Sequence, residues 1–198
     1  MQPLTGLVIC GGYSTRMGTD KSLLQYHGQS QRNHLYHLLQ PFCEKVFISC
    51  NNDQASTIGY DFDFITDDEQ YRHTGPIAAL LSAFDRQLNQ ALLVVGCDYP
   101  FITKESIHDL VSNRDENKAA VGFYNEAANL YEPLLCIYEN EMAEIIRNNF
   151  QQRQYALQKI LQQVAARKLY PKKITSIQSI DTRADYLLAL AEIKKMQG

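Results

Sequence analysis

A glycine-rich stretch near the amino terminus constrains this chain more than any other feature. The apolar run Leu4–Ile9 is typical of a buried strand, and it stops at the adjacent glycines Gly11 and Gly12. A polar loop with two cations, Arg16 and Lys21, follows. Glycine lets a ligand approach the backbone closely, and successive bare N–H groups can point at one anion. A strand that leads into such a loop, with a guanidinium and an ammonium beyond it, is what a nucleotide triphosphate site requires.

Two other glycine motifs do not fit this loop. The Walker loop needs four residues between its glycines and a lysine directly after the second. Here Gly12 and Gly18 enclose five residues, and Lys21 does not follow Gly18 directly. The dinucleotide fingerprint G-x-G-x-x-G fails because Gly11 and Gly12 are adjacent. An ordinary strand-to-helix turn with surface cations is the alternative, but glycines and cations that converge directly after a strand favour an anion site.

The same loop resembles the nucleotidyltransferase pattern L-x-G-G-x-S-x-R-M-G-x-D-K. Its two adjacent glycines are similar to those of the molybdenum cofactor guanylyltransferase family. Ile9 and Cys10 stand where that family usually has Leu and Ala. The resemblance implies an α/β fold: a three-layer α/β/α sandwich around a mostly parallel, Rossmann-like sheet of the nucleotide-diphospho-sugar transferase type. The matching residues are Ser14, Arg16, Met17, Gly18, Asp20 and Lys21.

Length and charge limit the classes of protein to consider. A chain of 198 residues suits one α/β domain. We expect a single nucleotidyltransferase domain over 1–198, with a nucleotide-binding half at 1–101 and an acceptor-binding half at 102–198. The net charge of −3 provides no global basic field, so neither nucleic acid nor a membrane surface is an expected partner.

Cysteine usage and the lack of long apolar runs bear on location. The five cysteines are odd in number and show no C-x-x-C spacing, so neither a disulfide framework nor a zinc site is indicated. A reducing cytoplasm fits this pattern best. We see no signal peptide, and no apolar run approaches the roughly 20 residues that a membrane-spanning helix needs.

Hydrophobic periodicity predicts strands that alternate with helices in the first half of the chain. This βαβ pattern predicts a parallel sheet with helices on both faces. In the last helix, the apolar residues that would face inward in part are Leu187, Leu188, Leu190, Ala191 and Ile193. Strands are predicted at Leu4–Ile9, Lys45–Cys50, 61–66, Ala91–Gly96, 119–124 and 133–138, and helices at 31–42, 76–88, 106–111, 140–150, 154–166 and from a cap at Thr182 to residue 195.

Asp98 follows the predicted central strand Ala91–Gly96. Ligands of parallel sheets bind beyond the carboxyl ends of the strands. An aspartate there can share a Mg²⁺ ion with triphosphate oxygens, although a turn aspartate that caps the next helix would look the same. The resemblance decides between them, because the family's C-D-x-P motif, matched at 97–100, implies that Asp98 is the Mg²⁺ ligand.

Other strand ends provide nucleotide-binding candidates by resemblance. Asp67 occupies the position of a family aspartate that contacts the nucleotide, although a solvated acid is the simpler interpretation. Gly75 and Pro76 match a family G-P pair that opens a helix beside the nucleotide. Ser49 and Asn51 stand where the family has N-x-N, and the serine is a shorter donor and acceptor.

The second half carries weaker signals for an acceptor. Pro133 lies in a stretch that resembles the family strand lining the second-substrate side. Asp181 and Arg183 replace the Asn and Pro of the family's N-T-P-E-D motif. An ionised Asp181 cannot donate a hydrogen bond as Asn can. A helix cap by Asp181 or Thr182 is an equal alternative.

The resemblance implies Mg²⁺-dependent transfer of GMP from GTP to the phosphate of molybdenum-molybdopterin, which yields molybdopterin guanine dinucleotide and pyrophosphate. The segment Ile9, Cys10, Gly11 and Gly12 would cradle the base and sugar, and Arg16, Lys21 and Asp98 would act on the phosphates. Molybdenum-insertion proteins and molybdoenzyme chaperones are implied partners. Two alternatives stay open: a cytidylyltransferase or other NTP transferase acting on molybdopterin or a sugar or polyol phosphate, and a non-catalytic nucleotide-binding adaptor.

Overall fold

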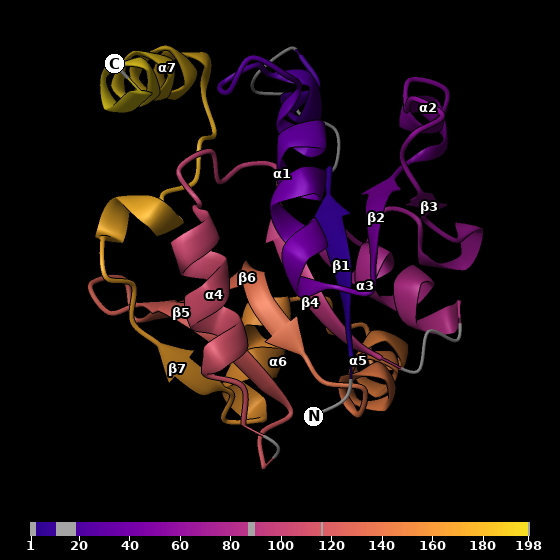
Figure 1. Ribbon diagram of the computed structural model, residues 1–198. Helices are drawn as coiled ribbons and strands as arrows, with labels where there is room; N and C mark the ends of the chain where they lie inside the picture. The colour runs from indigo at the N-terminus through magenta and orange to yellow at the C-terminus, as the bar shows by residue number, and fades with distance from the viewer. Residues whose placement is uncertain (1–2, 11–18, 87–89, 116, 198) are drawn as a thin grey trace.

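The computed structural model of the protein describes residues 3–10, 19–86, 90–115 and 117–197. These residues form a seven-stranded sheet in the order β3-β2-β1-β4-β6-β5-β7, with helices on both faces (Figure 1). The α/β/α sandwich expected from the sequence is confirmed. The strands are β1 Leu4–Ile9, β2 Lys45–Cys50, β3 Phe64–Thr66, β4 Ala91–Gly96, β5 Ala120–Asn125, β6 Leu130–Tyr138 and β7 Arg167–Leu169.

Helices occupy most of the connections between these strands. The α-helices are α1 Gln31–Leu39, α2 Asn52–Ala55, α3 Pro76–Asp85, α4 Lys104–Ser112, α5 Met142–Gln151, α6 Leu157–Gln163 and α7 Arg183–Gln197. The short 3-10 helices are η1 Lys21–Leu23, η2 Gln40–Phe42, η3 Glu69–Tyr71 and η4 Ile174–Ile177. Among the residues that the structure describes, no helix is both long enough and apolar enough to cross a membrane.

The sheet is parallel except for β6. β1 pairs in parallel with β2 and β4, and β2 pairs in parallel with β3. β6 runs antiparallel to both β4 and β5. β5 therefore has the same direction as β4, and β7 pairs in parallel with β5. The carboxyl ends of β3, β2, β1 and β4 therefore share one edge, and the segments that follow these strands meet there.

Both faces of the sheet are buried, which explains why the central strands are apolar apart from the buried Thr5 of β1. In β1, Leu7 and Ile9 point into a core with α3, α5 and α6, whereas Leu4 and Val8 point into a core with α1 and α4. All six residues of β1 and all six of β4 are buried. This two-sided packing fixes the position of the strand ends that carry the candidate site.

The last helix, α7, packs on this scaffold along a narrow stripe. Ala189 and Ile193 are buried with Phe101 and Ile180, and Thr182 caps the helix as predicted. Inward packing was wrongly predicted for Leu187 and Leu188, which are 57% and 71% exposed, and for Ala191, which is also exposed. The reason is geometric: contacts at positions four apart occupy one helix face, and these leucines lie beside it.

The predictions for the second half were otherwise approximate. The strand β7 was missed, because three residues of a basic segment show no alternation of apolar and polar side chains. The predicted helix at 154–166 forms only over α6, which starts at Leu157. A helical period is therefore visible in sequence beyond the residues that keep helical geometry.

Candidate functional site

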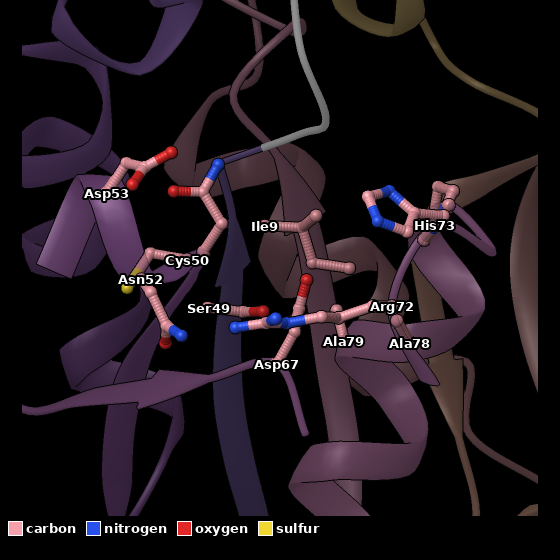
Figure 2. Close-up of a pocket in the computed structure, with 13 residues that line it drawn as sticks. Ile9, Ser49, Cys50, Asn52, Asp53, Asp67, Arg72, His73, Ala78 and Ala79 are labelled. Atoms are coloured by element: carbon pink, nitrogen blue, oxygen red, sulfur yellow. The ribbon is translucent and has the colours of Figure 1, made fainter. Parts of the chain in front are cut away.

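A cavity of about 370 Å³ opens at the carboxyl ends of β1 and β2 and at the start of α3 (Figure 2). Its wall contains five of the predicted nucleotide-binding residues: Ile9, Ser49, Asn51, Asp67 and Gly75. A cavity of this volume is within the range of small-molecule sites. The fold therefore brings these residues, which come from four separate segments, into one wall.

Helix α3 presents its amino terminus to this cavity. Gly75 precedes the helix with φ of 77°, a left-handed conformation that glycine adopts without strain, and Pro76 occupies the first turn. The first N–H groups of a helix carry a partial positive charge. The buried apolar residues that follow hold α3 against the sheet, so this end is fixed in place.

Asp67 and Ser49 form a polar pair in the cavity wall. Burial raises the pKa of Asp67 to about 6, and a hydrogen bond with the Ser49 hydroxyl opposes this rise. The backbone N–H of Asp67 donates to the Cys50 carbonyl at 3.1 Å, which extends the pairing of β2 and β3. The buried Oδ1 of Asp67 has no hydrogen-bond partner within the described ranges. It can accept a hydrogen bond from an N–H or O–H group of a ligand.

Asn51 supports the cavity wall through a reciprocal cap at the start of α2. Its Oδ1 accepts from the backbone N–H of Gln54 at 2.9 Å, and Gln54 Oε1 accepts from the Asn51 N–H at 3.1 Å. The Asn51 oxygen is therefore committed to the helix cap. What Asn51 can offer a ligand is its amide N–H donors.

A second polar cluster lies beyond the end of β4, around Asp98. The Asp98 carbonyl accepts from the Ile180 N–H at 2.8 Å. Lys21 Nζ donates to the Ile180 carbonyl at 2.8 Å and to Asp181 Oδ1 at 2.7 Å. Lys21, Asp98 and Asp181 come from distant parts of the chain, and the segment before α7 brings them together.

Burial raises the pKa of Asp98 to about 6, and its neighbours act in both directions. The positive charge of Lys21 lowers the pKa, whereas the carboxylates of Asp181 and Glu132 raise it. Without the charge of Lys21, the pKa of Asp98 would be higher and the acid would stay protonated to a higher pH. Lys21 therefore favours the ionised form of Asp98 near neutral pH.

The donor chemistry at Asp98 fits Mg²⁺. Its Oδ1 is buried without a hydrogen-bond partner in the described part of the chain, and a carboxylate oxygen is the ligand that this ion prefers. No group of three or more His, Cys, Asp or Glu residues suited to a metal occurs in the described segments. Asp98 alone therefore fits an ion that takes its other ligands from phosphates and water.

The two clusters are joined through β1 and β4. Ile9, in the cavity wall, pairs with Gly96, and the Ile9 carbonyl accepts from the Cys97 N–H at 3.0 Å. Cys10 is buried, does not line the cavity, and donates its N–H to the Ser49 carbonyl at 3.0 Å. Gly11 and Gly12, predicted to cradle the base and sugar, and Arg16, predicted to bind the phosphates, lie outside the described residues.

Residues 6–168 match the family model described as a MobA-like NTP transferase domain. This chain belongs to that family. A bifunctional molybdenum cofactor biosynthesis protein of Synechocystis sp. is 27% identical over 184 residues, which are 93% of this chain. The chain spans about half of that relative, with 53% of it covered. The family resemblance noted in the glycine loop is thus confirmed.

Other relatives cover more of their own length. A molybdenum cofactor guanylyltransferase of Pseudomonas fluorescens is 28% identical over 69% of this chain and 68% of its own. A protein of Flavobacterium johnsoniae, named as a probable molybdenum cofactor guanylyltransferase, is 23% identical over 96% of this chain and 100% of its own.

Solved structures share the fold. Molybdopterin-guanine dinucleotide biosynthesis protein A from Archaeoglobus fulgidus gives a TM-score of 0.78 at 22% identity, with 97% of this chain and 100% of that chain covered. A CMP:2-keto-3-deoxy-manno-octonic acid synthetase complexed with CTP gives a TM-score of 0.75 at 12% identity, with 98% and 99% covered.

The site of this MobA-like domain includes residues that the sequence alone did not reveal. A Cβ at Gly96 would collide with Asp98 Oδ1 and lie 3.0 Å from Leu134 Cβ, so only glycine lets the Asp98 carboxylate fold back over β4. Arg72 and His73 are exposed and line the cavity, where Figure 2 shows His73 on the side opposite Asp53. The sequence signal that could have identified Gly96 was a glycine at the end of an apolar strand, directly before Cys97 and Asp98.

Strand β6 contains Pro133, one of the two residues predicted to bind the acceptor. Pro133 is half-buried in this strand, and its carbonyl accepts from the Tyr138 hydroxyl at 2.8 Å. The neighbouring Glu132 accepts from the Tyr99 hydroxyl at 2.8 Å, and burial raises its pKa. Glu132 therefore joins β6 to the loop that carries Asp98, a role that the sequence pattern did not identify.

The raised pKa values of Asp67 and Asp98 in this MobA-like domain predict a pH-dependent stability. Both acids have a pKa of about 6 in the fold against an ordinary value of 3.8. The folded protein then keeps protons that the unfolded chain has lost, so these acids should lower the free energy of unfolding as pH rises from about 4 to about 6. Urea unfolding of the ligand-free protein and of the double variant D67N/D98N should show the fall mainly in the unsubstituted protein. Parallel curves for the two proteins would contradict this assignment.

Proposed function

We propose that this chain transfers GMP from GTP to the terminal phosphate of molybdopterin or its molybdenum form. The products would be the guanine dinucleotide form of the cofactor and pyrophosphate. The proposal is carried by a nucleotide-sized cavity at the end of β1 and by the cluster of Lys21 and Asp98, which does not line the cavity but lies beyond the end of the neighbouring strand β4. The family assignment and the guanylyltransferase names of its relatives support GTP and molybdopterin as the substrates.

The nucleotide would occupy the half formed by residues 1–101. The buried Asp67 Oδ1 would accept from an N–H or O–H group of the nucleoside, and the amino terminus of α3 would face its polar groups. The backbone from Ile9 through Cys10, Gly11 and Gly12 would pass beside the base and sugar. The acceptor would bind against residues 102–198, with Pro133 and Asp181 on its side of the cluster.

Catalysis would depend on positioning and charge neutralisation. An oxygen of the acceptor phosphate attacks the α-phosphorus of GTP in line with the bond to the β-phosphate. A new P–O bond forms, the bond to the bridging oxygen breaks, and its electron pair leaves with pyrophosphate. The nucleophile is already ionised, so no protein base is required.

Lys21 and Arg16 would bind the β- and γ-phosphates and stabilise the departing pyrophosphate. In the free protein the Lys21 ammonium is held by Asp181, so the triphosphate would compete with that carboxylate. Asp98 would hold Mg²⁺, which when bound neutralises charge on the α- and β-phosphate oxygens.

Several further features belong to the same proposal. We expect the protein to act in the cytoplasm, since the buried free thiols of Cys10, Cys50, Cys97 and Cys136 suit a reducing compartment. Molybdenum-insertion proteins and molybdoenzyme chaperones are the proposed partners that exchange substrate and product with it.

The base and the reaction can be tested separately. With Mg²⁺ present, GTP should raise the melting temperature more than CTP, UTP or ATP. At 100 times its Kd, a ligand adds roughly 2.7 kcal/mol to the free energy of unfolding. Pyrophosphate release should then require both GTP and purified molybdopterin. A larger effect of CTP would favour a cytidylyltransferase, and GTP binding without pyrophosphate release would favour a non-catalytic adaptor.

A further inference from the structure

The side chain of Gln54 joins two segments of the site that are far apart in the sequence. Its Oε1 accepts from the Asn51 N–H at 3.1 Å, within the cap at the start of α2. Its Nε2 donates to Asp20 Oδ2 at 2.9 Å. One amide thus connects the turn after β2, which forms part of the cavity wall, with the residue that precedes Lys21.

Asp20 uses its two carboxylate oxygens for two different contacts. Oδ1 accepts from the Ser22 N–H at 2.9 Å and caps η1, the 3-10 helix that begins with Lys21. Oδ2 takes the hydrogen bond from Gln54. Because the carboxylate is planar, holding Oδ2 also sets the direction of Oδ1, and therefore the orientation of η1.

The charge of Asp20 acts on two of the strand ends that border the site. The Asp20 carboxylate contributes to the raised pKa values of both Cys50, at the end of β2, and Cys97, just beyond β4. These strands lie on either side of β1. The contact with Gln54 therefore ties the start of η1 to the turn after β2, and Lys21, the first residue of η1, reaches the Ile180 carbonyl beside Asp98.

The backbone of Gln54 is hydrogen-bonded through Thr57 to helix α1. Its carbonyl accepts from the Thr57 hydroxyl at 2.6 Å, and Thr57 Oγ1 accepts from Arg32 Nη1 at 2.9 Å. Arg32 is 4% exposed and belongs to α1, which packs against the sheet. A buried arginine thus ties α2 to the scaffold, so Gln54 has a fixed base from which to hold Asp20.

We propose that Gln54 is a positioning residue for the phosphate-binding cation Lys21. It acts through Asp20 and fixes the distance between the triphosphate end and the cavity wall at Asn51. The inference rests on the proposed function, because it assigns Lys21 to the phosphates of GTP. Glutamine suits the position because it accepts from the Asn51 N–H and donates to Asp20 at the same time.

A substitution can break the Asp20 contact and leave the cap intact. Glutamate is a usual residue at this capping position, so Gln54→Glu keeps the acceptor for the Asn51 N–H. It also turns a donor into a carboxylate opposite Asp20, which makes the contact repulsive. In the double variant D20N/Q54E the introduced asparagine amide can donate to the introduced carboxylate, and its oxygen can still accept from the Ser22 N–H. The polarity of the bridge is reversed and its geometry is retained.

The experiment compares the wild type with Q54E, D20N and D20N/Q54E. We expect Q54E to weaken Mg²⁺-GTP binding and to slow GTP-dependent pyrophosphate release by about 10- to 100-fold, the scale of a small misplacement of a catalytic group. Guanosine, which has no phosphate, should bind Q54E within about threefold of its affinity for the wild type. The double variant should recover most of the loss. Equal losses for guanosine and GTP, or no recovery in D20N/Q54E, would overturn the role of Gln54.

Amide hydrogen exchange provides a measurement that does not depend on nucleotide. The Ser22 N–H should exchange faster in Q54E than in the wild type and slow again in D20N/Q54E. Unchanged exchange in Q54E would refute the positioning role whatever the activity. If the wild type neither binds GTP nor releases pyrophosphate, the proposed function fails, while the exchange data still decide whether Gln54 fixes η1.

Discussion

Replacing Asp98 with asparagine is expected to slow GTP-dependent pyrophosphate release by at least about 100-fold, the loss typical of removing one group that stabilises a transition state. The buried Oδ1 of Asp98, like that of Asp67, has no hydrogen-bond partner in the described residues, but only Asp98 of these two has Lys21 among the charges that shift its pKa. Asparagine keeps the shape of the side chain but removes the charge that would hold Mg²⁺. Initial rates with saturating GTP and molybdopterin, over a series of Mg²⁺ concentrations, measure the effect.

The same variant should be more stable than the wild type at neutral pH in the absence of ligands. Burial raises the pKa of Asp98 to about 6, so ionisation at pH 7 costs folding free energy that a neutral amide does not require. Loss of activity together with a higher urea midpoint distinguishes a functional acid from a structural one. Asp61 is exposed and lies outside the cavity wall, so Asp61→Asn is the matched control and should change neither quantity. A D98N rate within threefold of the wild type would remove Asp98 from the mechanism.

The first half of the fold could be predicted because its signals are local and repeated. Two-sided burial makes β1 and β4 apolar at every position but Thr5, and Pro76 marks the start of α3. The later elements depend on their surroundings. β7 is three residues long and takes its place only by pairing with β5, so nothing in its own side chains identifies it.

The candidate site was predictable where an acidic side chain follows the end of a strand. Asp67 directly follows β3 and Asp98 comes two residues after β4, and the direction of a parallel sheet brings them to one edge. Gln54 gave a local signal, since N-x-x-Q matches a capping pattern, but its contact with Asp20 spans 34 positions and depends on the folded chain. Gly96 is similar, because its need for a bare Cα appears only once the Asp98 carboxylate folds back.

Replacing Lys21 with methionine should also reduce kcat/KM for GTP by at least about 100-fold, because the variant lacks a cation where negative charge develops on the leaving pyrophosphate. Methionine keeps much of the apolar stem of this side chain, which is 18% exposed, and so limits effects on packing. Lys172→Met is the matched control, since Lys172 is exposed and its ammonium contacts Glu105 and Asp109 at 3.0 Å. If K21M keeps near-normal turnover, Lys21 does not stabilise the phosphates during the reaction.

The pH profile separates a catalytic loss from a simple loss of charge pairing. Lys21 lowers the pKa of Asp98, so K21M should raise that pKa and move the acid limb of the kcat/KM profile to higher pH. Asp181 acts in the opposite sense, because its carboxylate raises the pKa of Asp98 and occupies the Lys21 ammonium at 2.7 Å. Asp181→Asn should therefore move the limb to lower pH and tighten GTP binding, since the triphosphate no longer competes with a carboxylate for Lys21. In K21M/D181N the shift of the limb should be smaller than in K21M, while the rate stays low, because the ammonium itself is still missing.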